Sequence, residues 1–404
     1  MRPRGVAGIL STMSEPSDRL FTPAFLALTL SELAYFTVGG LVIGLTPFFV
    51  TGPIGSDEAG LGLVAGAFGV TTLLLRPFAG RLADRRGRRP LLVGGALLCA
   101  LVVAAHALPL GLATLIGLRL LLGVAEAFYF VAGYAALADL APRGRTGEAL
   151  SFNSLALYLG LALGPILGQV LMGAGGFGLA WAGGFAIALV ATLLALRIPE
   201  TTTPEARAAA AAGPAPALLH RAAIGPGAAL FTGVAAMSAY LLLAGPHAER
   251  MGLEAWSVTF LVFGGVVVAF RIVFARLPDR VAPMRLGSLA LAMIAVGLGV
   301  VAVAPGLGGL LTGTVLLAGG VAFMTPAFFA ATFARVEPGE RGSAAGTGSL
   351  FIDLGFTGGP FVAGMVAAAA GAPSAFAVAG TIALTGALGA LVVPRLGRQV
   401  VSAD

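Results

Sequence analysis

Four ionisable residues stand inside long apolar stretches of this sequence: Glu32, Arg119, Glu126 and Asp353. A charge near the centre of a lipid bilayer is costly, so such side chains usually face a water-filled cavity or pair with one another. Arg119 and Glu126 are seven positions apart and share one face of a helix. We predict that these four residues carry proton coupling, with Glu126 as the proton site and Glu32 second. We expect Asp353 to bind either a proton or a cationic substrate. The competing interpretation is static ion pairs between helices.

Aromatic and amide side chains near these residues form a second candidate group. Ring-bearing and polar side chains together can line an amphipathic cavity for an organic compound. The alternative for each ring is ordinary packing or contact with lipid. The predicted substrate-binding residues are Tyr35, Phe36, Phe128, Tyr129, Asn153, Tyr158, Tyr240, Phe323 and Phe328.

Several kinds of chemistry have no signature in this sequence. The chain has no Lys, so the phosphate-binding loop that ends in Gly-Lys-Ser/Thr cannot occur. Hydrolase motifs and clusters of Cys and His are also missing, and the single Cys99 allows no disulfide within the chain. We predict no metal, no cofactor and no enzyme activity. The energy source is then an ion gradient or the substrate's own gradient.

The composition indicates what must position these side chains. Hydrophobic residues make up 58% of the 404 residues and charged residues only 10%, whereas soluble domains have about 45–50% and about 25%. The sequence therefore predicts an all-α integral membrane protein, because a spanning helix needs about 20 apolar residues. The predicted spans are twelve, at residues 21–50, 58–80, 90–109, 112–138, 147–172, 177–197, 224–246, 255–276, 284–304, 307–333, 343–369 and 373–393.

Arginine marks alternate loops between these spans. Loops near residues 81–89, 143–145, 197–221, 276–285 and 335–341 are basic, and the opposite loops hold no Arg except Arg250. By the positive-inside rule both chain ends and the middle loop face the cytoplasm. We therefore predict a multi-pass protein of the cell's inner (plasma) membrane. Its partners are the lipid bilayer, protons and a small molecule, without nucleic acid, and we predict a monomer.

The chain also repeats itself. A shift of 195 residues places Arg76 on Arg271 and the stretch 147–165 on 342–360 without a gap. The sequence predicts two six-helix bundles, at 1–198 and 224–404, joined by a cytoplasmic linker at 199–223 that is rich in Ala, Pro and Thr. Two parallel repeats around a central site are typical of transporters.

With these residues in place, the chain resembles the major facilitator superfamily over nearly its whole length. The segment Gly80-Arg81-Leu82-Ala83-Asp84-Arg85-Arg86-Gly87-Arg88-Arg89 matches that family's signature between helices 2 and 3, and Arg119 with Gly123 looks like its helix 4 element. The helix 5 run from Gly160 to Gly168 is similar to the element of proton-coupled antiporters. The closest subgroup by resemblance is drug and metabolite efflux carriers.

The resemblance implies roles for two further sets of residues. A cytoplasmic gate would use Asp84 against the start of helix 11, near Gly342, where a helix dipole favours an anion, and Arg88 against Asp139. The helix 5 glycines would form a seam against ion leakage, or plain helix packing. The full sets are Gly80, Asp84, Arg85, Gly87, Arg88, Arg89 and Asp139 for the gate, and Gly160, Gly164, Pro165 and Gly168 for the seam.

We therefore expect a proton-coupled secondary transporter that exports a small amphipathic organic compound, such as a drug, metabolite or natural product, by alternating access. One alternative is a proton symporter or facilitator that imports a sugar or organic acid. Another is a membrane receptor or scaffold without transport.

Overall fold

The computed structural model describes residues 20–108, 111–142, 146–212, 219–274, 277–304, 306–336 and 341–401, and all regular secondary structure in these ranges is helical. The chain is therefore all-α, as predicted. The helices are α1 Pro23–Thr51, α2 Glu58–Arg86, α3 Arg88–Ala105, α4 Leu112–Leu140, α5 Thr146–Ala195, α6 Pro204–Ala212, α7 Arg221–Arg250, α8 Val258–Val273, α9 Leu277–Arg280, α10 Pro283–Val303, α11 Gly306–Phe333 and α12 Arg341–Val401.

Two of these helices each hold two of the predicted spans. Within α5 the backbone turns at Gly175 and Gly176, and within α12 it turns at Gly371. Gly176 and Gly371 have φ of 70° and 81°, a region that glycine enters without the penalty of a Cβ. Among the described residues nine helices are long and apolar enough to cross a membrane, and α8 is a shorter apolar helix. With α5 and α12 divided at their turns, these elements match the twelve predicted spans.

The predicted boundary between spans two and three is wrong by several residues. The sequence suggested a charged loop from Arg81 onward, but α2 continues to Arg86 and the chain turns only at Gly87, where φ is 104°. Gly80 lies inside the helix, and a Cβ there would meet only Val131 at 3.9 Å. The charged segment is therefore mostly a helix end, and only its second glycine is needed for a turn.

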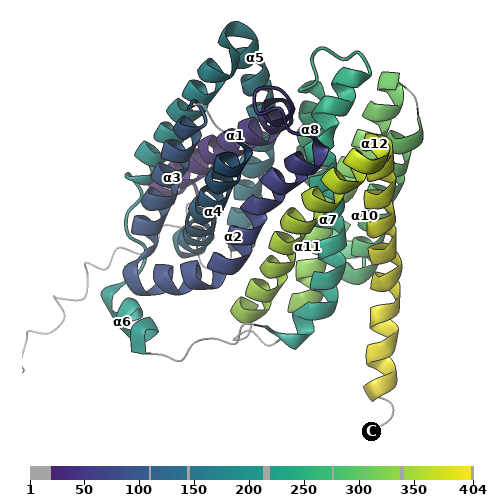
Figure 1. The fold of residues 1–404 in the computed structure, drawn as a ribbon. Helices are drawn as coiled ribbons and strands as arrows, with labels where there is room; N and C mark the ends of the chain where they lie inside the picture. The colour runs from purple at the N-terminus through teal and green to yellow at the C-terminus, as the bar shows by residue number, and fades with distance from the viewer. Residues whose placement is uncertain are drawn as a thin grey trace, which may run out of the picture.

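Two helical bundles stand side by side (Figure 1). In the first, α1 packs chiefly on α5, and in the second α7 packs chiefly on α12. The main contacts between the bundles are α2 on α12 and α5 on α8, with a smaller one between α1 and α7. The α2–α12 and α5–α8 contacts are equivalent under the 195-residue repeat. Helix α2 corresponds to α8, and the first part of α5 corresponds to the first part of α12.

The segment after the first bundle is more than a tether. Part of the linker predicted at 199–223 forms α6, which contacts α2, and α7 already begins at Arg221. Residues 213–218 lie outside the described residues. In Figure 1, α6 and the end of α12 lie at the same end of the molecule. We call this end the basic side, since it holds the arginine-rich turn at Gly87, and we call the end with residues 52–57 and 251–257 the opposite side.

Candidate functional site

A buried ion pair joins the two bundles. The Arg76 guanidinium on α2 donates from Nε to Asp353 Oδ2 on α12 at 2.5 Å and from Nη2 to Oδ1 at 2.7 Å. The two side chains are only 13% and 3% exposed. Paired, two-point geometry of this kind is the strongest form of an arginine–carboxylate contact. Asp353, a predicted proton-coupling residue, is therefore held by a residue that sequence reasoning missed. The signal was available, since Arg76 also lies inside a predicted span.

Glu126 lies beside this pair. Its half-buried carboxyl group is within electrostatic range of both Arg76 and Asp353, and the Tyr35 side chain is within hydrogen-bonding reach of it. The ring of Tyr35 is stacked on that of Tyr129, with centroids 3.9 Å apart and planes within 5°. The charge of Glu126, in the first bundle, can therefore influence the Arg76–Asp353 contact between the bundles.

Glu32 is the second acid of this cluster, and it is 2% exposed. It accepts a hydrogen bond from the Asn153 side-chain amide and is within electrostatic range of Glu126. A Cβ at Gly133 on α4 would lie 2.9 Å from a Glu32 carboxyl oxygen, so that glycine leaves the space the acid occupies. Asn153, which we expected at a substrate, contacts the acid here.

Arg119 is not part of the cluster, although it shares a face of α4 with Glu126. Seven residues span about 10 Å along a helix, and Arg119 lies toward the opposite side. It is 5% exposed and donates a hydrogen bond to the Thr46 hydroxyl of α1. Among the described residues it forms no ion pair with an acid. The structure therefore separates Arg119 from the three acids with which we expected it to work.

A second arginine that sequence reasoning missed lies at the repeat-equivalent contact. Arg271 on α8 donates from Nη1 to the Ser154 hydroxyl of α5 at 2.7 Å and from Nη2 to the Tyr158 hydroxyl at 3.5 Å. Its guanidinium carbon lies 4.7 Å from the centre of the Tyr158 ring. Tyr158, expected at the substrate, is thus a cation–π partner between the bundles.

The remaining predicted aromatic residues divide into two groups. Phe36 on α1 contacts the rings of Tyr35 and Phe130, with centroids 5.7 and 6.4 Å away, and Phe128 lies on α4 two positions from Glu126. Tyr240, Phe323 and Phe328 belong to the second bundle and are buried. The Tyr240 hydroxyl shares a hydrogen bond with Thr314, so this ring is fixed by packing away from the acids.

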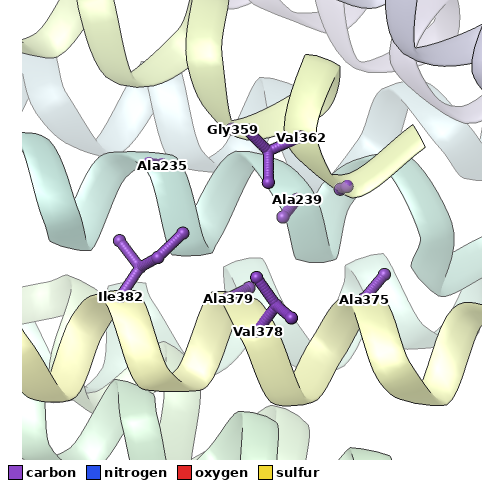
Figure 2. Close-up of a pocket in the computed structure, with 9 residues that line it drawn as sticks. Ala235, Ala239, Gly359, Val362, Ala375, Val378, Ala379 and Ile382 are labelled. Atoms are coloured by element: carbon purple, nitrogen blue, oxygen red, sulfur yellow. The ribbon is translucent and has the colours of Figure 1, made fainter. Parts of the chain in front are cut away.

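A small pocket in the second bundle does not resemble a substrate site. Figure 2 shows its lining, which comes from α7 and both parts of α12 and consists of Ala, Gly, Val and Ile. Its volume of about 10 Å³ is barely that of one water molecule. We interpret it as a packing gap between three helices.

The predicted seam of glycines packs against a neighbouring helix of the first bundle. A Cβ at Gly160 would lie 2.7 Å from the backbone nitrogen of Thr37, and one at Gly168 would lie 3.1 Å from Leu45. Gly164 likewise meets α1 backbone, and Pro165 packs against Gly44 of the same helix. The four residues thus let α5 lie directly on α1.

The arginine-rich turn is held by a network within the first bundle. Arg88 pairs with Asp84 at 2.5 Å and with Asp139 at 3.5 Å, the second of which was expected from sequence. Asp84 is 54% exposed, and its expected partner region near Gly342 lies outside the part of the chain whose side chains are described. The exposed Arg89 donates to the Leu196 carbonyl at 2.8 Å, and Arg85 is also exposed.

Glu200 caps this turn and was not recognised from sequence. Its carboxylate accepts hydrogen bonds from the backbone N–H groups of Arg88 at 2.9 Å and Arg89 at 3.3 Å. Burial alone raises the pKa of Glu200, but hydrogen bonds from Arg88, Thr202 and Arg89 outweigh it and lower the pKa below its ordinary value. The start of the linker is thereby tied to the first turn of α3, where the helix dipole favours an anion.

On the opposite side, polar contacts cross between the bundles. The Gln169 amide donates to the Glu254 carbonyl at 2.6 Å and accepts from the Ser257 backbone N–H at 3.0 Å. Arg250, the one arginine that the sequence places in an opposite loop, pairs with Glu58 at 2.7 Å. Among the described residues, the polar contacts of the basic turn stay within the first bundle. At the two ends of the molecule, the polar contacts that cross between the bundles are therefore those of the opposite side.

Two six-span helical bundles with ionisable groups between them define a polytopic membrane protein with transporter architecture. Within the described residues no cluster of three or more His, Cys, Asp or Glu could hold a metal ion. The sequence model of the Major Facilitator Superfamily matches residues 26–311. The chain belongs to this superfamily, whose members are transporters and not enzymes.

Relatives and solved structures support the same assignment. An uncharacterized MFS-type transporter of Salmonella typhimurium is 31% identical over 91% of this chain and 94% of its own length. One from Pseudomonas aeruginosa is also 31% identical, over 91% and 92%. Among solved structures, a bacterial homologue of the human lysosomal transporter Spinster, in an inward-facing and occupied conformation, has a TM-score of 0.73 at 15% identity, with 92% and 96% covered. The human organic anion transporter MFSD10 has a TM-score of 0.69 at 21% identity, with 93% and 100% covered.

Proposed function

We propose that this transporter exports a small amphipathic organic compound in exchange for protons. The observation that carries the proposal is that Glu126 lies within electrostatic range of both partners of the Arg76–Asp353 ion pair. Ionised Glu126 adds a second negative charge within electrostatic range of the Arg76 guanidinium, whereas protonated Glu126 does not. The proton therefore changes the strength of a contact between the two bundles.

Glu32 is a second acid beside which a proton can be taken up in the cluster. Glu32 and Glu126 lie within electrostatic range of each other. The Asn153 amide donates a hydrogen bond that stabilises a charged Glu32, and the Tyr35 side chain lies near Glu126. Two carboxyl groups within electrostatic range of each other are a suitable arrangement for proton uptake on one side and release on the other.

We assign the basic side to the cytoplasm by the distribution of arginine. The bundles are tied on the opposite side by Gln169 and by the Arg250–Glu58 pair, so the described conformation is closed toward the outside. In the alternate state, Asp84 and Arg88 would tie the bundles on the cytoplasmic side. Arg250 on the outer side then serves this closure, which explains its exception to the arginine pattern.

The substrate would contact the rings near the acid cluster. Tyr35 is within hydrogen-bonding reach of Glu126, Phe36 contacts the Tyr35 ring, and Phe128 lies two positions from Glu126 on α4. Such a lining suits a compound with a ring and a polar group. The fold neighbours named above as organic anion and lysosomal transporters, and a nucleoside transporter of similar fold, are consistent with an organic substrate.

The test is transport in proteoliposomes under an imposed proton gradient, with a panel of fluorescent dyes and drugs. We expect a substrate to move against its own gradient while protons move the other way. Glu126→Gln should abolish this movement, whereas Glu205→Gln on the exposed α6 removes an acid far from the cluster and should preserve it. Movement of both species in one direction would instead identify an importer. Absence of any flux would favour a receptor, and unchanged pumping by Glu126→Gln would remove that acid from the proton role.

A further inference from the structure

The two interfaces between the bundles are equivalent in position but not in charge. Under the 195-residue repeat Arg76 corresponds to Arg271, and Asp353 corresponds to Tyr158. Arg76 therefore meets a carboxylate across the α2–α12 contact, while Arg271 meets a phenol ring across the α5–α8 contact. The repeat preserves the cation at both contacts and the anion at only one.

Arg271 carries a charge that the described residues do not neutralise. Its hydrogen-bond partners, Ser154 and Tyr158, are neutral hydroxyl groups, and no described carboxylate forms an ion pair with it. Its Nε is buried and has no hydrogen-bond partner in the described part of the chain. Ser154 and Tyr158 lie about 12 and 18 Å along α5 from its first residue, by 1.5 Å per residue. A cation at that depth is costly without a counter-charge.

The surroundings of Arg271 are aromatic as well as cationic. The Tyr134 phenol lies within electrostatic range of both Arg271 and Tyr158, and its side chain is exposed. Phe274, one helical turn beyond Arg271, is 43% exposed and lies 6.4 Å from Phe323 by ring centroids. A ring next to an anionic group would find apolar surface on one side and the guanidinium on the other.

We propose that Arg271 binds the anionic group of the transported compound, so that the substrate is an aromatic organic anion with a carboxylate, sulfonate or phosphate group. Ser154 and Tyr158 orient the guanidinium, whose forked N–H groups match the oxygens of such an anion. The inference rests on the proposed transport function and adds the charge of the substrate to it.

The other intramembrane arginines are less suited to this role. Asp353 already occupies two donors of Arg76. Arg119 is 5% exposed, donates to Thr46, and lies toward the side on which the bundles are tied together. Arg271 is only half-buried. It thus combines partial access with an unmet charge, a combination that the other two do not have.

Equilibrium binding to the purified full chain in detergent tests this without any gradient. The probes are naphthalene-2-carboxylate, naphthalene-2-sulfonate, naphthyl phosphate and the neutral naphthalene-2-carboxamide, and the readout is the shift of the melting temperature with concentration. We expect the anions to raise the melting temperature of the wild type and the carboxamide to leave it unchanged. Arg271→Gln should lose this shift. Arg285→Gln, which removes an exposed cation at the start of α10, should keep it.

Arg271→Lys keeps the charge but not the fork, so we expect anion affinity to fall about tenfold, and this variant carries the test if Arg271→Gln does not fold. The proposal is overturned if no anion of the panel binds the wild type, if the carboxamide binds as well as the carboxylate, or if both Arg271 variants bind the anions as the wild type does. Anion binding needs no proton movement. A failure of proton coupling in liposomes therefore does not affect the binding test, and a failure of anion binding does not affect the test of proton coupling.

Discussion

The ion pair between Arg76 and Asp353 should couple the two bundles energetically. Removing one partner of a buried pair costs about 3–5 kcal/mol, because the other charge stays buried and uncompensated. Here Arg76 keeps 13% exposure and has Glu126 in electrostatic range, so part of that cost is offset. We therefore expect Asp353→Asn to lower the free energy of unfolding by about 2–3 kcal/mol.

A double-mutant cycle isolates the pair from the effects of each substitution. Arg76→Gln, Asp353→Asn and the double variant are compared with the wild type by unfolding in mixed micelles of dodecyl maltoside and SDS. We expect a coupling energy of at least about 1.5 kcal/mol, well above the ~0.5 kcal/mol within which independent sites add.

The Arg250–Glu58 pair offers a matched control in the same molecule. It joins the same two bundles at 2.7 Å, but its side chains are 54% and 28% exposed. Exposed pairs are worth about 0.2–1 kcal/mol. A coupling for Arg76–Asp353 no larger than that of Arg250–Glu58 would refute the argument that burial makes the inner pair the stronger link.

Three further predictions follow from other parts of the structure. Because hydrogen bonds lower the pKa of Glu200, its carboxylate stabilises the fold above its ordinary pKa of 4.5, and this contribution is lost as pH falls through the lower folded value. Glu200→Gln should thus lower the free energy of unfolding by about 0.5–1 kcal/mol at pH 7, as for a lost helix cap. The free energies of unfolding of the variant and the wild type should converge in acid. A difference that does not change with pH would contradict the cap. Gly164→Ala should destabilise by about 1–3 kcal/mol because the methyl group meets α1 backbone, while Gly173→Ala, with nothing within 4 Å, should melt like wild type. Asp84→Asn should slow transport in liposomes without changing expression, and wild-type rates would favour a purely topological role for the charged segment.

The acid cluster shows how far one helix can be interpreted alone. Glu32 and Glu126 were identified because a carboxyl group inside an apolar span is costly wherever the span lies. Arg119 was assigned to the same cluster because it shares a face with Glu126. The structure gives Glu126 a different cation, Arg76, which belongs to another helix. Periodicity gives the face of a side chain, but the neighbour across that face is chosen by packing.

The glycine seam gives the same lesson for packing. The spacing of Gly160, Gly164 and Gly168 predicted a close helix contact, and the contact exists. Its partner is α1 of the same bundle, and spacing on α5 cannot distinguish α1 from a helix of the other bundle. The Glu200 cap was missed because it links a linker residue to a helix start more than a hundred residues away.

The sequence by itself determined the class of this protein, because apolar length, arginine distribution and internal repetition are properties of local composition that the bilayer selects directly. It also identified the acids, whose burial follows from their spans. Only the tertiary structure decided which charges meet, since Arg76 finds Asp353 and Arg271 finds Tyr158 across helices that are joined by packing and not by the chain. The energy of a buried charge depends on its neighbours within a few ångströms, and those neighbours exist only once the two bundles are assembled.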